Sequence, residues 1–246
     1  MQNLKNKVAF VTGGSRGIGQ EIVRKFVSEG VNVAFTYASS EETANLLASE
    51  LSNEEIKVLP IKADSSNAES ILNAVEQAHR ELGNFDILVN NAGLGGGATL
   101  YEVSLDDFDR LVAVNIRGVF VVTQAVAALM NDEGRIITIG STAAERAMFP
   151  GTAVYGMTKA AVAGFTRGVA RDLAARKITV NTVQPGPIDT EMNPADSQFA
   201  DFLRSFIALG SYGTKSDVAE LAAFLASPQA KFITGTSINV DGGLVS

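Results

Sequence analysis

Short apolar runs alternate along this chain with longer segments in which apolar residues recur every three or four positions. Runs such as Ala9–Val11 and Ile87–Val89 are continuously apolar, as expected for parallel strands that are covered on both faces of a sheet. The segments between them have the helical period. This alternation predicts an α/β fold, a single doubly wound parallel sheet of about seven strands with helices on both faces.

The predicted boundaries follow the apolar pattern. Strands are predicted at Lys7–Thr12, Val31–Tyr37, Ile56–Ala63, Phe85–Val89, Arg135–Ile139, Ile178–Val183 and Ser237–Val240. Helices are predicted at Gln20–Glu29, Glu41–Ser52, Asn67–Leu82, from Ser104 to about Met130, from Tyr155 to about Arg176, and at Ser216–Ala226. No linker or repeat interrupts this order, so residues 1–246 are expected to form one dinucleotide-binding domain.

Residues 187–213 break the alternation. Phe199, Phe202 and Phe206 recur there at three- and four-residue spacings, which predicts a short amphipathic helix. We expect this segment to be a substrate lid whose apolar face excludes water from the cleft. The alternative, that the apolar face simply packs on the body of the domain, stays open.

Composition narrows the choice of partners. The net charge is −7 and the isoelectric point about 4.8, which argues against nucleic acid or an anionic membrane as a partner. The absence of cysteine excludes disulfides and thiolate metal sites. With His79 as the only histidine, a histidine-rich metal site is excluded too, and no metal is expected. The polar start Met1–Lys7 does not resemble a secretion signal, and a cytoplasmic location is expected.

The loop Gly13–Gly19 lies between the first predicted strand and the first predicted helix. Glycines at 13, 14, 17 and 19 allow the backbone to approach a ligand closely, and a helix N-terminus binds anions such as pyrophosphate. The spacing is neither that of the general dinucleotide fingerprint nor that of a Walker A loop. A purely structural turn remains the alternative.

Tyr155 and Lys159 are four residues apart near the start of a predicted helix, so their side chains share one face. A phenol, with a pKa near ~10, is a weak base at neutral pH. A nearby cation and the positive end of the helix dipole both favour the phenolate. We therefore expect a lowered pKa for Tyr155, which then exchanges protons near neutrality.

Several motifs together identify a family by resemblance. They are Thr12–Gly19, Asn90–Gly93, Asn115, Ser141, Tyr155 with Lys159, and Pro185–Gly186. In this order and spacing they resemble the short-chain dehydrogenase/reductase family over nearly the whole chain. The resemblance implies a Rossmann-like domain, a nicotinamide cofactor and a catalytic tetrad of Asn115, Ser141, Tyr155 and Lys159.

The resemblance also implies a role for each member of the tetrad. Ser141 binds the substrate oxygen, and Tyr155 gives or takes the proton. Lys159 lowers the pKa of Tyr155 and holds the nicotinamide ribose. Asn115 holds a water that links Lys159 to solvent.

The end of the second predicted strand indicates the type of cofactor. No carboxylate precedes Glu41 there, whereas enzymes that use NAD usually place an acid at this point to bind the ribose 2′-hydroxyl. Arg16 matches the basic residue that meets a 2′-phosphate in this family, and Ser39 and Ser40 add hydroxyl donors. NADP(H) is therefore the preferred cofactor, and NAD(H) remains possible. The further cofactor contacts implied by the resemblance are Gly13, Ser15, Gly17, Ile18, Gly19, Asp64, Ser65, Asn91, Ala92, Gly93, Tyr155, Lys159, Pro185, Gly186, Ile188 and Thr190.

The expected reaction is reversible reduction of a ketone or aldehyde to an alcohol, as in carbonyl reductases. The substrate pocket is expected to be lined by Leu94–Gly97, Thr142–Phe149 and residues 192–212. The resemblance also implies a homotetramer, since in this family the Tyr155 helix and the Asn115 helix form a dimer face. Small residues such as Ala160 and Gly164 could allow close helix packing there. They can equally pack within one chain.

Two alternatives stay open. The chain also resembles 3-oxoacyl-[acyl-carrier-protein] reductases, although Asn131-Asp-Glu133 is acidic where the carrier-docking surface of that subgroup is basic. An acidic surface repels an acidic carrier. Val183–Thr190 and Asn193–Ala195 resemble a family member linked to cyclic-dinucleotide binding, which suggests a regulator. A pure binder, however, has no use for an activated tyrosine.

Overall fold

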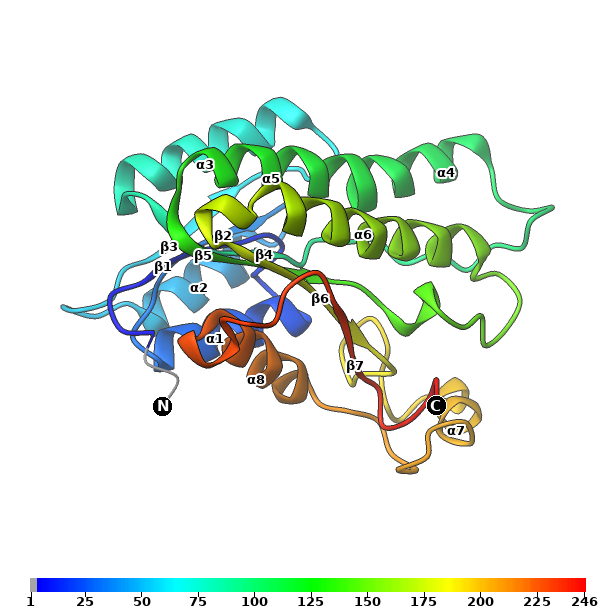
Figure 1. Ribbon diagram of the computed structural model, residues 1–246. Helices are drawn as coiled ribbons and strands as arrows, with labels where there is room; N and C mark the ends of the chain where they lie inside the picture. Colours follow the sequence, from blue (N-terminus) through cyan, green and yellow to red (C-terminus); the bar gives the residue numbers. More distant parts are fainter. Residues whose placement is uncertain (1–3) are drawn as a thin grey trace.

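Seven parallel strands form one sheet in the computed structural model, which describes residues 4–246 (Figure 1). In chain order the strands are β1 (Val8–Val11), β2 (Asn32–Tyr37), β3 (Val58–Lys62), β4 (Phe85–Asn90), β5 (Met130–Ile139), β6 (Thr179–Pro185) and β7 (Ser237–Val240). Their order across the sheet is β3-β2-β1-β4-β5-β6-β7, and every neighbouring pair is parallel. The predicted doubly wound sheet is confirmed.

The helices cover both faces of this sheet. They are α1 (Gly17–Ser28), α2 (Glu41–Leu51), α3 (Ala68–Leu82), α4 (Leu105–Val112), α5 (Val119–Ala128), α6 (Ala153–Asp172), α7 (Gln198–Arg204) and α8 (Lys215–Ala226). Figure 1 shows α3, α5 and α6 above the sheet and α1, α2 and α8 below it, with α7 outside these layers. The short helix predicted within residues 187–213 is α7.

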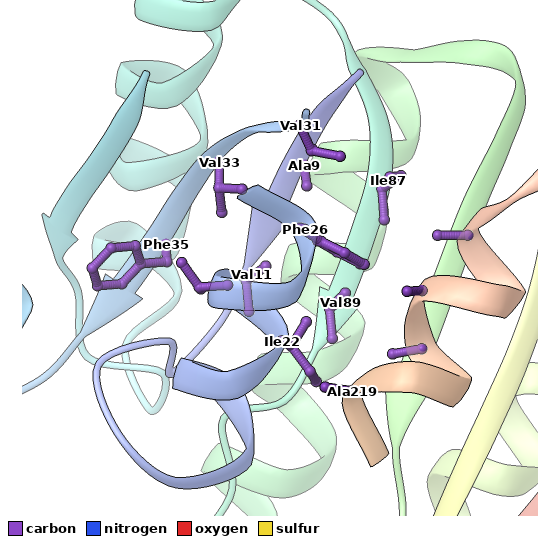
Figure 2. Packing of buried hydrophobic residues seen from close by; sticks show 14 of the residues in the cluster. Ala9, Val11, Ile22, Phe26, Val31, Val33, Phe35, Ile87, Val89 and Ala219 are labelled. Atoms are coloured by element: carbon purple, nitrogen blue, oxygen red, sulfur yellow. The ribbon is translucent and has the colours of Figure 1, made fainter. Parts of the chain in front are cut away.

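Each face of the sheet has its own apolar core. Figure 2 shows the core beneath α1, where Phe26 and Ile22 of the helix meet Val11 and Val89 of the central strands. The opposite core joins Phe10 and Phe85, whose rings meet edge to face with centroids 5.7 Å apart. Both faces of the central strands are buried, so their sequences are continuously apolar. This is the pattern from which the strands were predicted.

Two boundaries differ from the predicted ones. β5 begins at Met130, five residues early, because a register shift opposite β4 and a left-handed Glu133 (φ 62°) let polar residues continue the strand. The long helix predicted from Ser104 contains a π-helical turn, Ala113–Gly118, between α4 and α5. Such turns occur frequently at functional sites, and this one contains Asn115.

The stretch Leu105–Ala128, which joins α4, the π turn and α5, is long and apolar enough to cross a membrane by length and composition alone. In this protein it lies along one face of the sheet, and residues such as Val122 and Val126 belong to the core on that face. Part of its apolar character is therefore that of a core helix.

Candidate active site

The strand order reverses between β1 and β4, so the loops that follow these two strands lie side by side. Ligands of open α/β sheets bind in the crevice at such a point. Thr12 joins the two loops, because its Oγ1 accepts hydrogen bonds of 3.0 Å from the N–H groups of Asn91 and Ala92. The Asn91 amide in turn donates to the carbonyls of Thr12 and Gly13.

The N-terminus of α1 fits a pyrophosphate group. Within the described chain, the backbone N–H groups from Ser15 to Gly19 have no hydrogen-bond partner. The first turn has no acidic residue and no side-chain cap. At Gly19 a Cβ atom would lie 2.2 Å from the Gly13 oxygen, so only glycine allows this compact loop. The residues present are therefore those of an anion cradle.

The residues expected to recognise the 2′-phosphate lie at the carboxyl ends of neighbouring strands. Arg16 is exposed and has an extended backbone just before α1. Ser39 is exposed after β2, and Ser40 precedes α2. Arg16 and Ser39 are exposed and Ser40 is half-buried, and all three follow the carboxyl ends of neighbouring strands.

The residues expected to hold the adenine follow β3. The Asp64 carboxylate accepts hydrogen bonds of 2.8 Å from both the N–H and the hydroxyl of Ser66, so it shapes its own turn. Ser65 lines a small void together with Thr36 and Ala92. Ser65 therefore lies close to the crevice between β1 and β4.

Ser141 and Tyr155 are brought together from two elements. Ser141 follows β5, and its N–H donates 2.7 Å to the side chain of Gln184 on β6. Tyr155 lies in the first turn of α6, and its hydroxyl is close enough to the Ser141 side chain for that serine to lower its pKa. The two hydroxyl groups expected to meet one substrate oxygen are thus adjacent.

Lys159 is buried beneath Tyr155. Its ammonium donates 3.0 Å to the carbonyl of Ile139 and lies 5.7 Å from the centroid of the Tyr155 ring. Desolvation lowers the pKa of Lys159 to about 8, since burial penalises the charged form. Lys159 therefore lies next to Tyr155, as the sequence predicts, and it loses its proton more readily than an exposed lysine.

The predicted lowering of the Tyr155 pKa is wrong. Burial raises the pKa of the Tyr155 hydroxyl, and the hydrogen bond with Ser141 offsets this only in part. The physical reason is that the Lys159 ammonium points at the Ile139 carbonyl, so its charge does not compensate the desolvation of the phenol.

Asn115 clamps a loop. Its Oδ1 accepts from the N–H of Leu94 (2.8 Å), and its Nδ2 donates to the carbonyl of Leu94 (2.9 Å) and to the hydroxyl of Thr158 (3.1 Å). A Cβ placed on Gly93 would lie 3.4 Å from the Lys159 Nζ and 3.5 Å from the Asn115 Oδ1. Asn115 and Lys159 therefore flank the same glycine.

The remaining predicted contacts follow β6. Gly186 donates to the carbonyl of Val240, and a Cβ at Gly186 would lie 2.8 Å from Asp241, which accounts for the glycine. Ile188 is buried, with a backbone bridge to Gly213, while Thr190 pairs with Asn193. These residues fix the base of segment 187–213 at the crevice.

The aromatic residues of α7 form a row with Phe206, which lies just after this helix. The ring centroids of Phe199 and Phe149 are 5.0 Å apart, and Phe202 meets Phe206 at the same distance. Phe199 and Phe202 are each 46% exposed. The row therefore reaches the loop after Ser141 while keeping apolar surface in solvent.

Tyr155 also lines a cavity of about 340 Å³. Leu94–Gly97 line this cavity, whereas Thr142–Phe149 and residues 192–212, the other walls predicted for the substrate pocket, do not. Its other walls are Ala98, Val103, Asp107, Arg110, Leu111, Gly151, Val154 and Tyr155. Sequence reasoning missed the α4 residues, although Asp107, Arg110 and Leu111 share one helix face by their three- and four-residue spacing.

Comparison with known proteins agrees with this geometry. The family described as enoyl-(acyl carrier protein) reductase matches residues 13–245. A cyclic-di-GMP-binding biofilm dispersal mediator protein of Escherichia coli is 42% identical over 96% of both chains. A 3-oxoacyl-[acyl-carrier-protein] reductase of a Synechocystis species is 38% identical over 100% of this chain and 99% of its own.

Solved structures are similar over their full length. A short-chain dehydrogenase/reductase from Serratia marcescens is 55% identical, with a TM-score of 0.97 over 99% of this chain and 100% of its own. A blue fluorescent protein from a metagenomic library, solved in complex with NADPH, is 49% identical, with a TM-score of 0.98 over 100% of both chains.

Proposed function

This chain belongs to the short-chain dehydrogenase/reductase family, and on that premise we propose that it is an NADP(H)-dependent carbonyl reductase. It reduces a ketone or aldehyde to a secondary or primary alcohol, and the reaction is reversible. The observation that carries the proposal is the adjacent pair of hydroxyls on Ser141 and Tyr155 above the buried Lys159. General acid–base chemistry needs a proton donor or acceptor positioned within hydrogen-bond reach of the substrate oxygen, and Tyr155 beside Ser141 fits that role.

NADP(H) fits the residues of the chain. The free N–H groups at the start of α1 suit the pyrophosphate. The exposed Arg16 and the absence of a carboxylate before Glu41 favour a 2′-phosphate. The metagenomic relative that was solved with NADPH supports the same choice.

Each residue of the tetrad has a distinct task. When bound, NADPH supplies the hydride. Ser141 orients the substrate oxygen, and Tyr155 donates its proton to that oxygen during reduction or accepts it during oxidation. Lys159 supplies positive charge behind Tyr155, and Asn115 fixes the loop at Leu94. We retain the proposal that Asn115 also holds a water for proton exchange.

Residues 187–213 act in this proposal as the lid over the substrate. The row of phenylalanines on α7 reaches Phe149 in the loop beside Ser141. An apolar lid favours small and medium hydrophobic ketones, since closure removes water from the cleft.

We also propose a homotetramer in the cytoplasm. Apolar side chains remain exposed on the helices of one face, among them Leu105 (81%), Phe120 (47%) and Met157 (45%). Phe120 meets Phe165 edge to face, so α5 and α6 present a joint apolar surface that a second subunit can cover. Light scattering on the purified protein measures the assembly directly.

Carrier-protein reduction is the second candidate, because a curated relative has that name. The acidic residues after α5 pair with cations that follow α6, since Arg176 forms an ion pair with Asp132 and Lys177 with Glu133. A carrier protein, being acidic, would meet these carboxylates. This charge arrangement favours a free small-molecule carbonyl as the substrate.

One experiment separates the candidates. NADPH oxidation is followed with an aryl ketone, a 3-ketoacyl thioester and a 2-keto acid under identical conditions, and cyclic di-GMP binding is measured by calorimetry. We expect the largest kcat/KM for the ketone. A preference for the thioester would support carrier-linked reduction, and tight cyclic di-GMP binding without any turnover would support a regulator.

A further inference from the structure

We propose that the cavity between α4 and α6 is a second binding site, which takes a small carboxylate with a short apolar body. It is distinct from the place where the carbonyl reacts. The inference does not depend on the identity of the substrate, because it rests on the walls of the cavity and on their charges.

The loop Leu94–Gly97 separates the two spaces. A Cβ on Gly95 would lie 3.9 Å from the sulfur of Met192, which belongs to the lid segment. A Cβ on Gly96 would lie 3.2 Å from Leu111 and 3.7 Å from the Cβ of Tyr155. The loop therefore faces the lid on one side and the cavity on the other.

The cavity shares only Tyr155 with the catalytic tetrad, because Ser141, Lys159 and Asn115 do not line it. A carbonyl oxygen held by both Ser141 and Tyr155 is therefore outside it. Its volume of about 340 Å³ is at the lower end of the range for small-molecule sites. Val103, Leu111 and Val154 supply an apolar wall.

The donors in the wall favour an anion. The Arg110 guanidinium forms no ion pair and no hydrogen bond with any other residue from 4 to 246. The backbone N–H groups of Gly95, Gly96 and Gly97 likewise have no partner within that range. A guanidinium and a run of free N–H groups are the donors that bind carboxylates well.

The acids near this wall are already engaged. The Asp107 carboxylate accepts 2.7 Å from the hydroxyl of Ser104 at the start of α4. Glu102 accepts from the N–H and the hydroxyl of Thr99. Asp106 and Asp109 occupy other positions of α4 and do not line the cavity. Asp107 keeps its negative charge, and Arg110 is the side chain of this wall whose hydrogen-bond donors are not used within residues 4–246.

The test uses hexanoate and its neutral counterpart 1-hexanol on the full-length protein with ¹³C-labelled Leu and Val methyl groups. Hexanoate should shift the methyl signals of Val103, Leu111 and Val154 and leave Leu46, which is exposed on α2, unchanged. Arg110→Gln should weaken hexanoate binding by roughly tenfold or more. Arg80→Gln, which removes a cation from the remote Glu76 pair, should not.

Three further measurements complete the test. Val154→Phe should fill the cavity and abolish the shifts, and hexanol should bind more weakly than hexanoate. Hexanoate should change the rate of ketone reduction without competing with the ketone. Absence of the shifts, equal binding by Arg110→Gln, or purely competitive inhibition would each overturn the proposal. Turnover of the ketone is scored separately, so the proposed reductase activity stands or falls by itself.

Discussion

The Lys159 ammonium donates a 3.0 Å hydrogen bond to the carbonyl of Ile139 while lying 5.7 Å from the centroid of the Tyr155 ring. One cation is therefore fixed by the end of β5 and placed behind the phenol. Since the same strand leads directly into Ser141, β5 sets the positions of both partners of Tyr155.

Replacing Tyr155 with phenylalanine should abolish turnover and leave cofactor binding nearly intact. Only the hydroxyl that transfers the proton is lost, and general acid–base catalysis contributes about 10²–10⁴-fold to rates. NADPH oxidation measures the first effect and fluorescence titration with NADPH the second. If the variant kept the rate of the unmodified protein, the assignment of the tetrad would be wrong.

The stability of the protein should depend on the charge of Lys159. The pKa of Lys159 falls from 10.5 to about 8 on folding, so between these values the unfolded chain binds more protons than the folded one. The free energy of unfolding should therefore gain a contribution that rises with pH in this window, by at most about 1.4 kcal/mol per pH unit.

Urea unfolding at pH 8 to 10.5 measures this contribution as a difference between the unmodified protein and Lys159→Met. The raised pKa of Tyr155 has the opposite sign and acts only above the usual tyrosine pKa of 10. Identical slopes for both proteins would show that Lys159 does not titrate in this window.

Arg16→Ala should weaken the binding of NADPH much more than the binding of NADH. A charge-assisted contact to a phosphate is worth about 1.5–3 kcal/mol, or roughly tenfold to more than a hundredfold in affinity. Titration of the variant with both cofactors gives the ratio of dissociation constants. An equal loss of affinity for NADH and NADPH would show that Arg16 does not bind the 2′-phosphate.

Gly19→Ala should disturb the loop that receives the pyrophosphate. The added Cβ would lie 2.2 Å from the Gly13 oxygen and 2.4 Å from the Asn91 amide, and overpacking of this kind costs about 1–3 kcal/mol. Both the free energy of unfolding and the affinity for NADPH should fall. Gly97→Ala is the matched control, because its Cβ meets nothing within 4 Å.

Phe199→Ala should raise KM for an aryl ketone more than for a small aliphatic ketone. The substitution removes the ring whose centroid lies 5.0 Å from that of Phe149, a residue of the segment that follows Ser141. Steady-state kinetics with the two ketones give the comparison. Phe232→Ala is the control, because Phe232 is 98% exposed and lies outside segment 187–213. Equal KM changes for the two ketones would indicate that α7 only packs on the domain.

The sequence determined the fold class and the order of the motifs. Strands buried on both faces must be continuously apolar, so β1 and β4 were visible from their composition. The tight approach at Gly19 and the i, i+4 spacing of Tyr155 and Lys159 are local properties, which a linear pattern records directly.

Only the tertiary structure decided the electrostatics and the cavities. The pKa of Tyr155 depends on how deeply α6 buries the phenol and on where the Lys159 ammonium points, and neither follows from their spacing. The clamp from Asn115 to Leu94 and the cavity at Arg110 join residues from separate loops and helices. Such contacts arise when the layers pack, and no local pattern encodes their distances.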